Sequence, residues 1–408
     1  MKKQLSLGLA SVLLAGSAAA DGLYYVGAEA QESMPLKWVI GLDAVYDDNV
    51  NPTSGGDEED AFSLNPYVGL SVVSITPQTT WDVYARLGLI YYVDAPSEID
   101  DVYGQARVGA NLTHRFNERL RFASRNFLAY ELEPDYSYGF ATSRQMSEYF
   151  YWQTDNSIGY RWSERFATYT GFVLSGLDYG SEVPNGDRFS WTLYNQFRYQ
   201  LSPQSVATLD YRYTDTEADG FASDSTDQFL LVGLEHRFSP NSIIIVRAGA
   251  QFRDVDDGDE STSPFVELAT STRVNEAFTV RAFARYSMES YDTTQLFGNG
   301  LYDFSERQTL RIGVSAEYAI SPTLALFGGV DYIPSSFDEG DLRAASGPAP
   351  LTVSGLDEDI FNAYIGLSMK FTDYLTGTVT YNFTDSSSDF NSGDYDRNRI
   401  SVGVRAEF

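Results

Sequence analysis

Apolar side chains occupy every second position along most of this chain. In the segment 80–93, for example, Trp81, Val83 and Leu87 alternate with polar or small residues. A period of two is typical of a β-strand with one apolar and one polar face. The pattern therefore predicts a protein built almost entirely of strands.

Two kinds of turn separate these segments and alternate strictly along the chain. Short turns such as Thr76-Pro77-Gln78-Thr79 contain Pro, Ser or Asn, which form tight turns. Long loops such as 133–146 and 334–359 are acidic and rich in glycine. We count eighteen strands, with sixteen as the alternative if the edges of 334–359 are misassigned: 36–47, 61–75, 80–93, 102–116, 120–132, 147–162, 166–179, 188–201, 206–217, 227–238, 243–253, 263–274, 278–291, 305–320, 324–333, 360–372, 375–384 and 396–408.

Short turns on one rim and long loops on the other are typical of a transmembrane, up-and-down antiparallel β-barrel, which belongs to the all-β class. No segment beyond the N-terminal region has the run of about 20 apolar residues that a spanning helix needs. An even number of strands places both ends of the barrel on the periplasmic side. We therefore expect residues 36–408 to form a single barrel domain.

Both ends of the chain indicate export to the outer membrane of a Gram-negative bacterium. Lys2 and Lys3 precede an apolar run, and small residues end at Ala20, so residues 1–20 are predicted to be a cleavable signal peptide. Residues 21–35 would be a short periplasmic segment. The final strand contains Gly403 and ends on Phe408, which resembles the C-terminal signal recognised by the outer-membrane barrel assembly machinery. That machinery and outer-membrane lipid are therefore expected partners.

Strand parity predicts which charged residues point into the barrel. Placing the apolar residues outward leaves most strand arginines inward, and the lining candidates are Arg86, Arg107, Arg125, Arg198, Arg212, Arg247, Arg281, Arg285 and Arg311. The inward acids are fewer: Asp82, Asp155, Asp178, Asp210, Glu235, Glu267, Glu317 and Asp331.

Two interpretations of these arginines remain open. An arginine at the middle of a lipid-facing surface would cost about 2–4 kcal/mol, so inward placement is required whatever the function. The arginines could simply be part of a polar wall. Alternatively, they form a basic track that favours anionic solutes, because guanidinium groups pair with carboxylate, sulfate or phosphate.

The acids are concentrated in the loops and give the chain a formal net charge of −29. Such loops keep a surface solvated, or bind divalent cations shared with lipopolysaccharide. The segment 254–260 resembles a calcium loop but has Phe265 where a bidentate Glu would be needed, so only weak Ca²⁺ binding is expected. The negative charge argues against nucleic-acid binding.

The sequence contains no cysteine and only two histidines, so it offers little for catalysis. His114 and His236 each stand two residues before an aromatic residue beside a short turn, on the outward parity. This position favours an interfacial role. We therefore expect no enzymatic activity, no catalytic residue, no metal site and no cofactor.

The opening strand 38–47 runs into Tyr46-Asp47-Asp48-Asn49-Val50, and many regular hairpins follow. This arrangement resembles the β-barrel porin 2 family. The resemblance implies an outer-membrane porin for small hydrophilic solutes, with a link to exopolysaccharide production in some members. The alternative is a plugged structural barrel whose acidic loops bind divalent cations or partners.

The segment 334–359 is the longest loop, and its central part carries one charge, Arg343. Burying the more acidic loops would carry a desolvation cost. We therefore expect this segment to fold into the bore as a constriction, with Arg343 facing the solute.

Overall fold

The computed structural model describes residues 20–21, 24–25, 33–50, 58–96, 100–132, 147–179, 187–219, 223–239, 241–256, 258, 260–289, 294–391 and 394–408. Most of the expected signal peptide and periplasmic segment lies outside these residues, as do Asp57, the segment 133–146, Asp257 and Asp259. Ala20–Asp21 (β1) and Tyr24–Tyr25 (β2) form a separate two-stranded pair.

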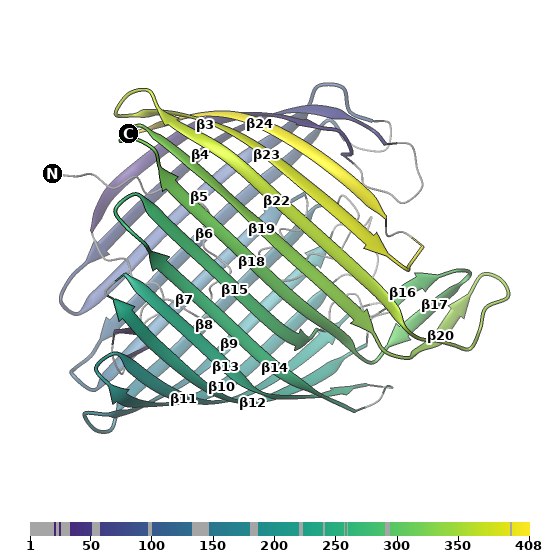
Figure 1. Ribbon diagram of the computed structural model, residues 1–408, viewed down its shortest axis with the longest axis horizontal. Helices are drawn as coiled ribbons and strands as arrows, with labels where there is room; N and C mark the ends of the chain where they lie inside the picture. Colours follow the sequence, from purple (N-terminus) through teal and green to yellow (C-terminus); the bar gives the residue numbers. More distant parts are fainter. Residues whose placement is uncertain are drawn as a thin grey trace.

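Eighteen strands form one closed antiparallel barrel (Figure 1), which confirms the predicted fold class and strand count. Two predicted strands, 61–75 and 166–179, have the observed bounds, and the others differ by a few residues at their ends. The barrel strands are β3 Met34–Asp47, β4 Ala61–Ile75, β5 Thr79–Tyr92, β6 Val102–Arg115, β7 Leu120–Glu131, β8 Tyr149–Arg161, β9 Phe166–Tyr179, β10 Arg188–Ser202, β11 Ser205–Ala218, β12 Ser225–Ser239, β13 Ser242–Val255, β14 Ser261–Arg273, β15 Phe278–Met288, β18 Arg307–Ala319, β19 Leu324–Phe337, β22 Leu356–Lys370, β23 Leu375–Ser388 and β24 Tyr395–Glu407.

The barrel closes where the last strand, β24, pairs with the first, β3. Trp38 and Phe408 exchange backbone hydrogen bonds of 3.0 and 2.8 Å at the end of this pair. No sheet edge is left open in the barrel, so the backbone groups of each strand have partners on both sides.

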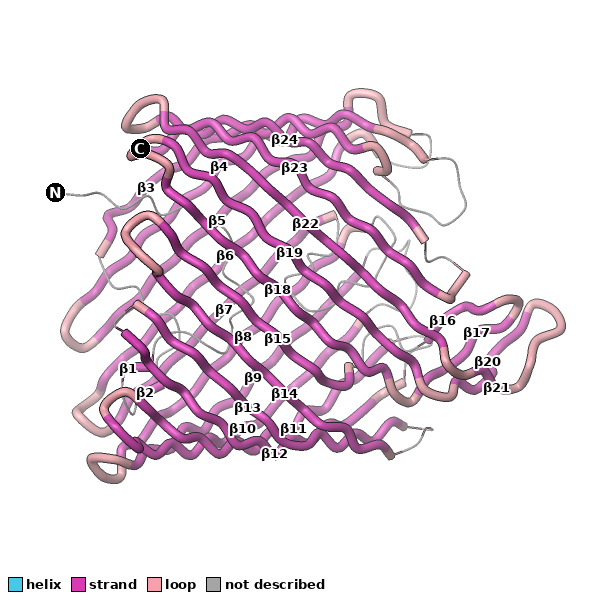
Figure 2. The backbone as a smooth tube through the Cα atoms, viewed as in Figure 1, coloured by secondary structure: helices cyan, strands magenta, loops and turns pink. Residues whose placement is uncertain are grey.

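The two ends of the barrel differ (Figure 2). At one end, which we call the turn end, tight turns join the strands, and Thr76 donates its backbone N–H to the carbonyl of Thr79 at 2.8 Å. The C-terminus lies at this end, and so does the start of β3. The opposite end, the loop end, carries the longer connections.

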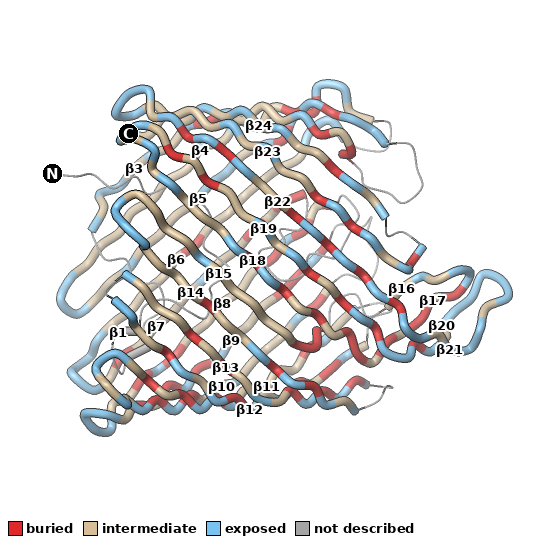
Figure 3. Tube along the Cα trace, in the orientation of Figure 1, coloured by how far each residue is buried: buried red, intermediate tan, exposed pale blue. Residues whose placement is uncertain are grey.

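Exposed and buried positions alternate along the strands (Figure 3). Most outward positions are apolar and exposed, as predicted for Trp81, Leu87 and Leu89 on β5, and the same holds for Ile365 on β22. The inward positions are mainly polar, charged, glycine or tyrosine. Among the described residues, no helix is long and apolar enough to span a membrane.

Inward aromatic rings lie over glycines of neighbouring strands. Tyr84 on β5 is in register with Gly109 on β6, and a Cβ atom at Gly109 would lie only 2.2 Å from the Tyr84 ring. Tyr67 covers Gly41 in the same manner. Each glycine therefore leaves room for a ring that packs flat along the wall.

A second, four-stranded sheet extends beyond the loop end. It contains β16 Thr294–Phe297, β17 Gly300–Phe304, β20 Gly340–Ala345 and β21 Thr352–Val353. We call it the outer sheet. Its apolar core unites three connections of the barrel and consists of Tyr302, Phe304, Phe337, Leu356 and Phe390.

The outer sheet overturns the expected constriction. The segment 334–359 extends β19 and β22 at its ends, and its middle forms β20 and β21, which project away from the barrel (Figures 1 and 2). Arg343 lies on β20, and its Nη1 atom is 2.6 Å from Oδ2 of Asp303 on β17. The prediction of an inward fold failed because the two long loops satisfy their backbone groups by pairing with each other.

Candidate functional site

The nine predicted lining arginines all lie at inward positions of their strands. They divide between two parts of the wall, which differ in how the arginines are partnered. Arg86, Arg107 and Arg125 belong to β5, β6 and β7, and the other six belong to β10, β11, β13, β15 and β18.

One row of register-paired positions crosses seven neighbouring strands. We call it the arginine row, and its members are Arg198, Thr208, Gly233, Arg247, Glu267, Arg285 and Arg311. Arg198 lies near the turn end of β10, whereas Arg311 lies near the loop end of β18. Because the strands are tilted, a row perpendicular to them climbs the wall from one end towards the other.

Carboxylates hold several members of this row. Arg198 donates through Nη1 and Nη2 to Glu235 at 2.7 and 2.6 Å. Arg247 donates to Glu267 at 3.0 Å and lies 4.0 Å from Asp210. Bidentate pairs of this kind fix the guanidinium plane as well as its position.

The loop-end part of the row is organised by Glu289, one residue beyond β15. It accepts two hydrogen bonds of 2.8 Å from Arg311 and one of 3.0 Å from Arg285. Burial raises the pKa of Glu289, but Arg311, with Arg285 and Arg307, lowers it more strongly, and the pKa lies at about 2. Glu289 is therefore a permanent anion at neutral pH.

Two further arginines lie on this part of the wall. Within the described part of the chain, Arg212 and Arg281 form no ion pair. Arg212, Arg247 and Arg285 all act electrostatically on Glu267, so three guanidinium groups surround one carboxylate. The row and these two residues together comprise six arginines, and the carboxylates that contact the arginines of the row are Asp210, Glu235, Glu267 and Glu289.

The other part of the wall is closer to neutral. Arg86 donates to Asp43 at 3.1 Å and stacks 3.7 Å above the Tyr67 ring. Arg125 lies 3.6 Å from Asp155. Arg107 forms a bidentate pair with Glu131.

Several of these acids were not among the predicted inward residues, and one predicted inward acid points outward. Glu131 and Glu289 lie inside the predicted strands 120–132 and 278–291 and have the parity of inward arginines on the same strand, which could have identified them. Asp178, predicted to be inward, is exposed and shares the outward parity of Phe172. Its β9 neighbour Leu177 is the inward residue, because it pairs with Arg188.

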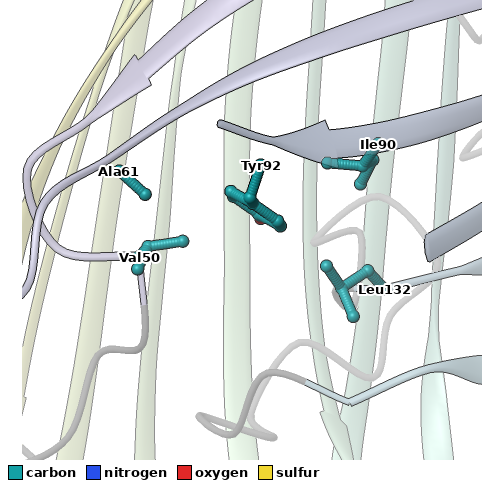
Figure 4. Close-up of a cluster of buried hydrophobic side chains, with 5 residues drawn as sticks. All are labelled: Val50, Ala61, Ile90, Tyr92 and Leu132. Carbon is teal, nitrogen blue, oxygen red and sulfur yellow. The ribbon is translucent and has the colours of Figure 1, made fainter. Parts of the chain in front are cut away.

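At the loop end the chain turns into the barrel. Val50 follows β3 and Leu132 follows β7, and both are buried against Ala61, Ile90 and Tyr92 on the inner wall (Figure 4). The backbone N–H of Val50 donates to the carbonyl of Glu59 at 2.9 Å, which joins the residue after β3 to the residues before β4. These two residues therefore place apolar side chains against the inner wall at the loop end.

Both histidines lie on the outward face at the turn end. His114 Nδ1 is 2.8 Å from Thr79 Oγ1, and His236 Nδ1 is 2.9 Å from Ser205 Oγ. Each ring packs edge-on against the aromatic residue two positions later, Phe116 or Phe238. Among the described residues, no group of three His, Asp or Glu side chains is placed to hold a metal ion.

No family model matches the chain, and no curated protein matches it. Solved structures of similar shape are outer-membrane proteins. OpdK from Pseudomonas aeruginosa is 14% identical, with a TM-score of 0.48, and the match covers 91% of this chain and 99% of OpdK. OccAB4 and the outer-membrane channel DcaP, both from Acinetobacter baumannii, are each 13% identical. Their TM-scores are 0.45 and 0.43, with 92% and 91% of this chain and 99% and 96% of theirs covered.

Proposed function

We propose that this protein is an outer-membrane channel through which hydrophilic solutes diffuse, with a preference for anions. An apolar outer surface and a polar, charged inner surface are what a barrel requires in a bilayer. A barrel of this size leaves an aqueous bore. The observation that carries the anion preference is the arginine row, together with Arg212 and Arg281, which form no ion pair with the described residues.

The charge distribution favours a direction for this traffic. The turn end would lie in the periplasm and the acidic loop end outside the cell. Acidic loops repel anions that arrive from outside, so anions leaving the periplasm are the better candidates. Anionic saccharides, including exopolysaccharide, fit this description, and the resemblance to the porin 2 family agrees with it. The loop acids would bind divalent cations bridging to lipopolysaccharide.

One observation favours the alternative of a plugged barrel. Arg198 and Tyr149 occupy inward positions, yet both side chains are 0% exposed. A bare bore would leave inward side chains in contact with water. If the lumen is filled over its whole height, the barrel would serve as a surface-interaction protein and would not conduct.

Conductance through planar bilayers separates these functions. The channel proposal expects discrete conductance steps and a reversal potential that indicates anion selectivity under a salt gradient. Replacing Arg212→Ala and Arg281→Ala together should shift selectivity towards cations. Arg343→Ala, on the outer sheet, is the control and should leave selectivity unchanged. Absence of conductance would favour the plugged barrel, and unchanged selectivity in the double variant would remove the role of these arginines.

A further inference from the structure

The outward face carries a polar patch in the middle of β7, β8, β9 and β10. It consists of Ser124, Asn126, Thr154, Asn156, Thr170 and Asn195, and we call it the outer polar patch. These residues share the parity of exposed apolar neighbours such as Ile158, Phe172 and Leu193. On the other barrel strands the central outward positions are apolar, as in Leu87 on β5 and Ile365 on β22.

Hydrogen bonds join the members of this patch into two groups. Thr154 donates to Asn126 Oδ1 at 2.7 Å, and Asn156 donates to Thr154 Oγ1 at 2.8 Å. Asn126 donates to Ser124 Oγ at 3.1 Å. In the second group, Asn195 donates to Thr170 Oγ1 at 2.7 Å.

These bonds do not satisfy the whole patch. Asn195 Oδ1 is buried and has no hydrogen-bond partner, whereas Asn126 and Thr170 are exposed. Hydrocarbon offers neither donors nor acceptors, so uncovered amides at this depth are costly. A protein surface with its own donors and acceptors would remove the cost, as interhelical hydrogen bonds do for polar residues of membrane helices.

We propose that the outer polar patch is the contact between copies of this chain in a closed homo-oligomer, with the symmetry axis beside β7–β10. The patch is uncharged and contains both donors and acceptors. An asparagine amide can therefore pair with the same amide of a second copy. Symmetric assemblies bring like residues together near the axis, so a self-complementary patch is the surface they require. The inference rests on the membrane location in the proposed function, but not on solute selectivity.

Cross-linking of single-cysteine variants tests the proposal, because the natural sequence has no cysteine. Asn126→Cys lies in the patch. Ile365→Cys is the matched control, because it is outward, central and on the opposite wall. After treatment of isolated outer membranes with a short bis-maleimide, Asn126→Cys should give a covalent dimer and Ile365→Cys should remain monomeric. No dimer, equal dimer from both variants, or an adduct whose mass indicates a different protein would each overturn the proposal.

A second variant removes the polar groups without adding a reactive one. Asn126→Leu, Thr154→Val and Asn195→Leu together should leave a heat-modifiable barrel in the outer membrane but convert the native mass in mild detergent from oligomer to monomer. An oligomer that survives these changes would overturn the proposal. Absence of the wild-type barrel from the outer-membrane fraction would instead contradict the proposed function.

Discussion

Asp43 on β3 lies across Gly403 on β24, at the seam where the barrel closes. The two residues are in register, and a Cβ atom at Gly403 would lie 2.1 Å from Asp43 Oδ1. The same carboxylate accepts a hydrogen bond of 3.1 Å from Arg86. Because Gly403 has no side chain, Asp43 can extend over β24 and still pair with Arg86 on β5.

Gly403→Ala should displace Asp43 and weaken its pair with Arg86. Both side chains are partly exposed, so we expect a loss of at most about 1 kcal/mol in the free energy of unfolding. In an Asp43→Ala background the same substitution should cost almost nothing, because the two residues are coupled. Unfolding of detergent-refolded barrels measures both effects. A normal unfolding curve with a low yield in cells would instead mean that the assembly machinery reads Gly403.

Phe408 closes the seam at the turn end. Its backbone pairs with Trp38, and its exposed ring stacks on Tyr374 with ring centroids 6.2 Å apart. Phe408→Ser keeps the backbone bonds and removes only the ring. We expect a lower assembled level in outer membranes, measured by heat-modifiable migration. Tyr374→Ser, which removes the same stacking, is the control. If both variants lower the level equally, the ring matters for packing and not as a signal.

The barrel could be predicted because apolar outward and polar inward residues alternate along each strand, and this pattern is local and visible in the sequence. The outer sheet could not, because β17 and β20 belong to different loops, and nothing in either loop alone indicates the pairing. The inward arginines followed from parity, whereas their acid partners lie across strands in a register that the sequence does not display. The Arg198–Glu235 pair, for example, joins β10 to β12 over the intervening β11.

The loop acids should influence conductance through their long-range field. Glu58, Glu59 and Asp60 are exposed at the loop end. Neutralising Asp57, Glu58, Glu59 and Asp60 should alter conductance at 0.01 M salt, where the screening length is about 30 Å, and have little effect at 1 M, where it is about 3 Å. Single-channel conductance of the wild type and the neutralised variant at both salt concentrations measures this difference. An equal effect at high salt would place these acids within the constriction.

Glu289 should make the loop end of the wall sensitive to acid. Its pKa in the folded barrel, about 2, lies below the ordinary value of 4.5. The stabilisation is therefore complete above pH 4.5 and is lost as the pH falls towards 2. Thermal unfolding in detergent should show this loss. The Glu289→Gln variant should be less stable than the wild type at neutral pH, and its stability should depend less on pH over the acidic range. Glu339→Gln, in an exposed loop position, is the control. If the stability of Glu289→Gln falls with pH as steeply as that of the wild type, Glu289 is not the cause of the acid sensitivity.

The outer sheet should not control conduction, in contrast to the constriction expected from the sequence. β17 pairs with β20, and Asn391 donates its backbone N–H to the carbonyl of Leu296 at 3.1 Å, so three connections are tied together outside the barrel. Leu351 is 79% exposed. Replacing residues 342–353 by a short Gly-Ser linker should therefore leave single-channel conductance and selectivity unchanged.

The same replacement should change the surface of the cell. An epitope inserted between Gly347 and Pro348 should bind antibody on intact cells, because these exposed residues lie in the connection between β20 and β21 of the outer sheet. The linker variant should lose the Arg343–Asp303 pair, and β16 and β17 should become easier to cleave with external protease. A severalfold rise in conductance would contradict this arrangement, since only a segment inside the bore could narrow it. The single variant Arg343→Ala separates the loss of the Arg343–Asp303 pair from the loss of the segment 342–353, because it breaks the ion pair without shortening the loop.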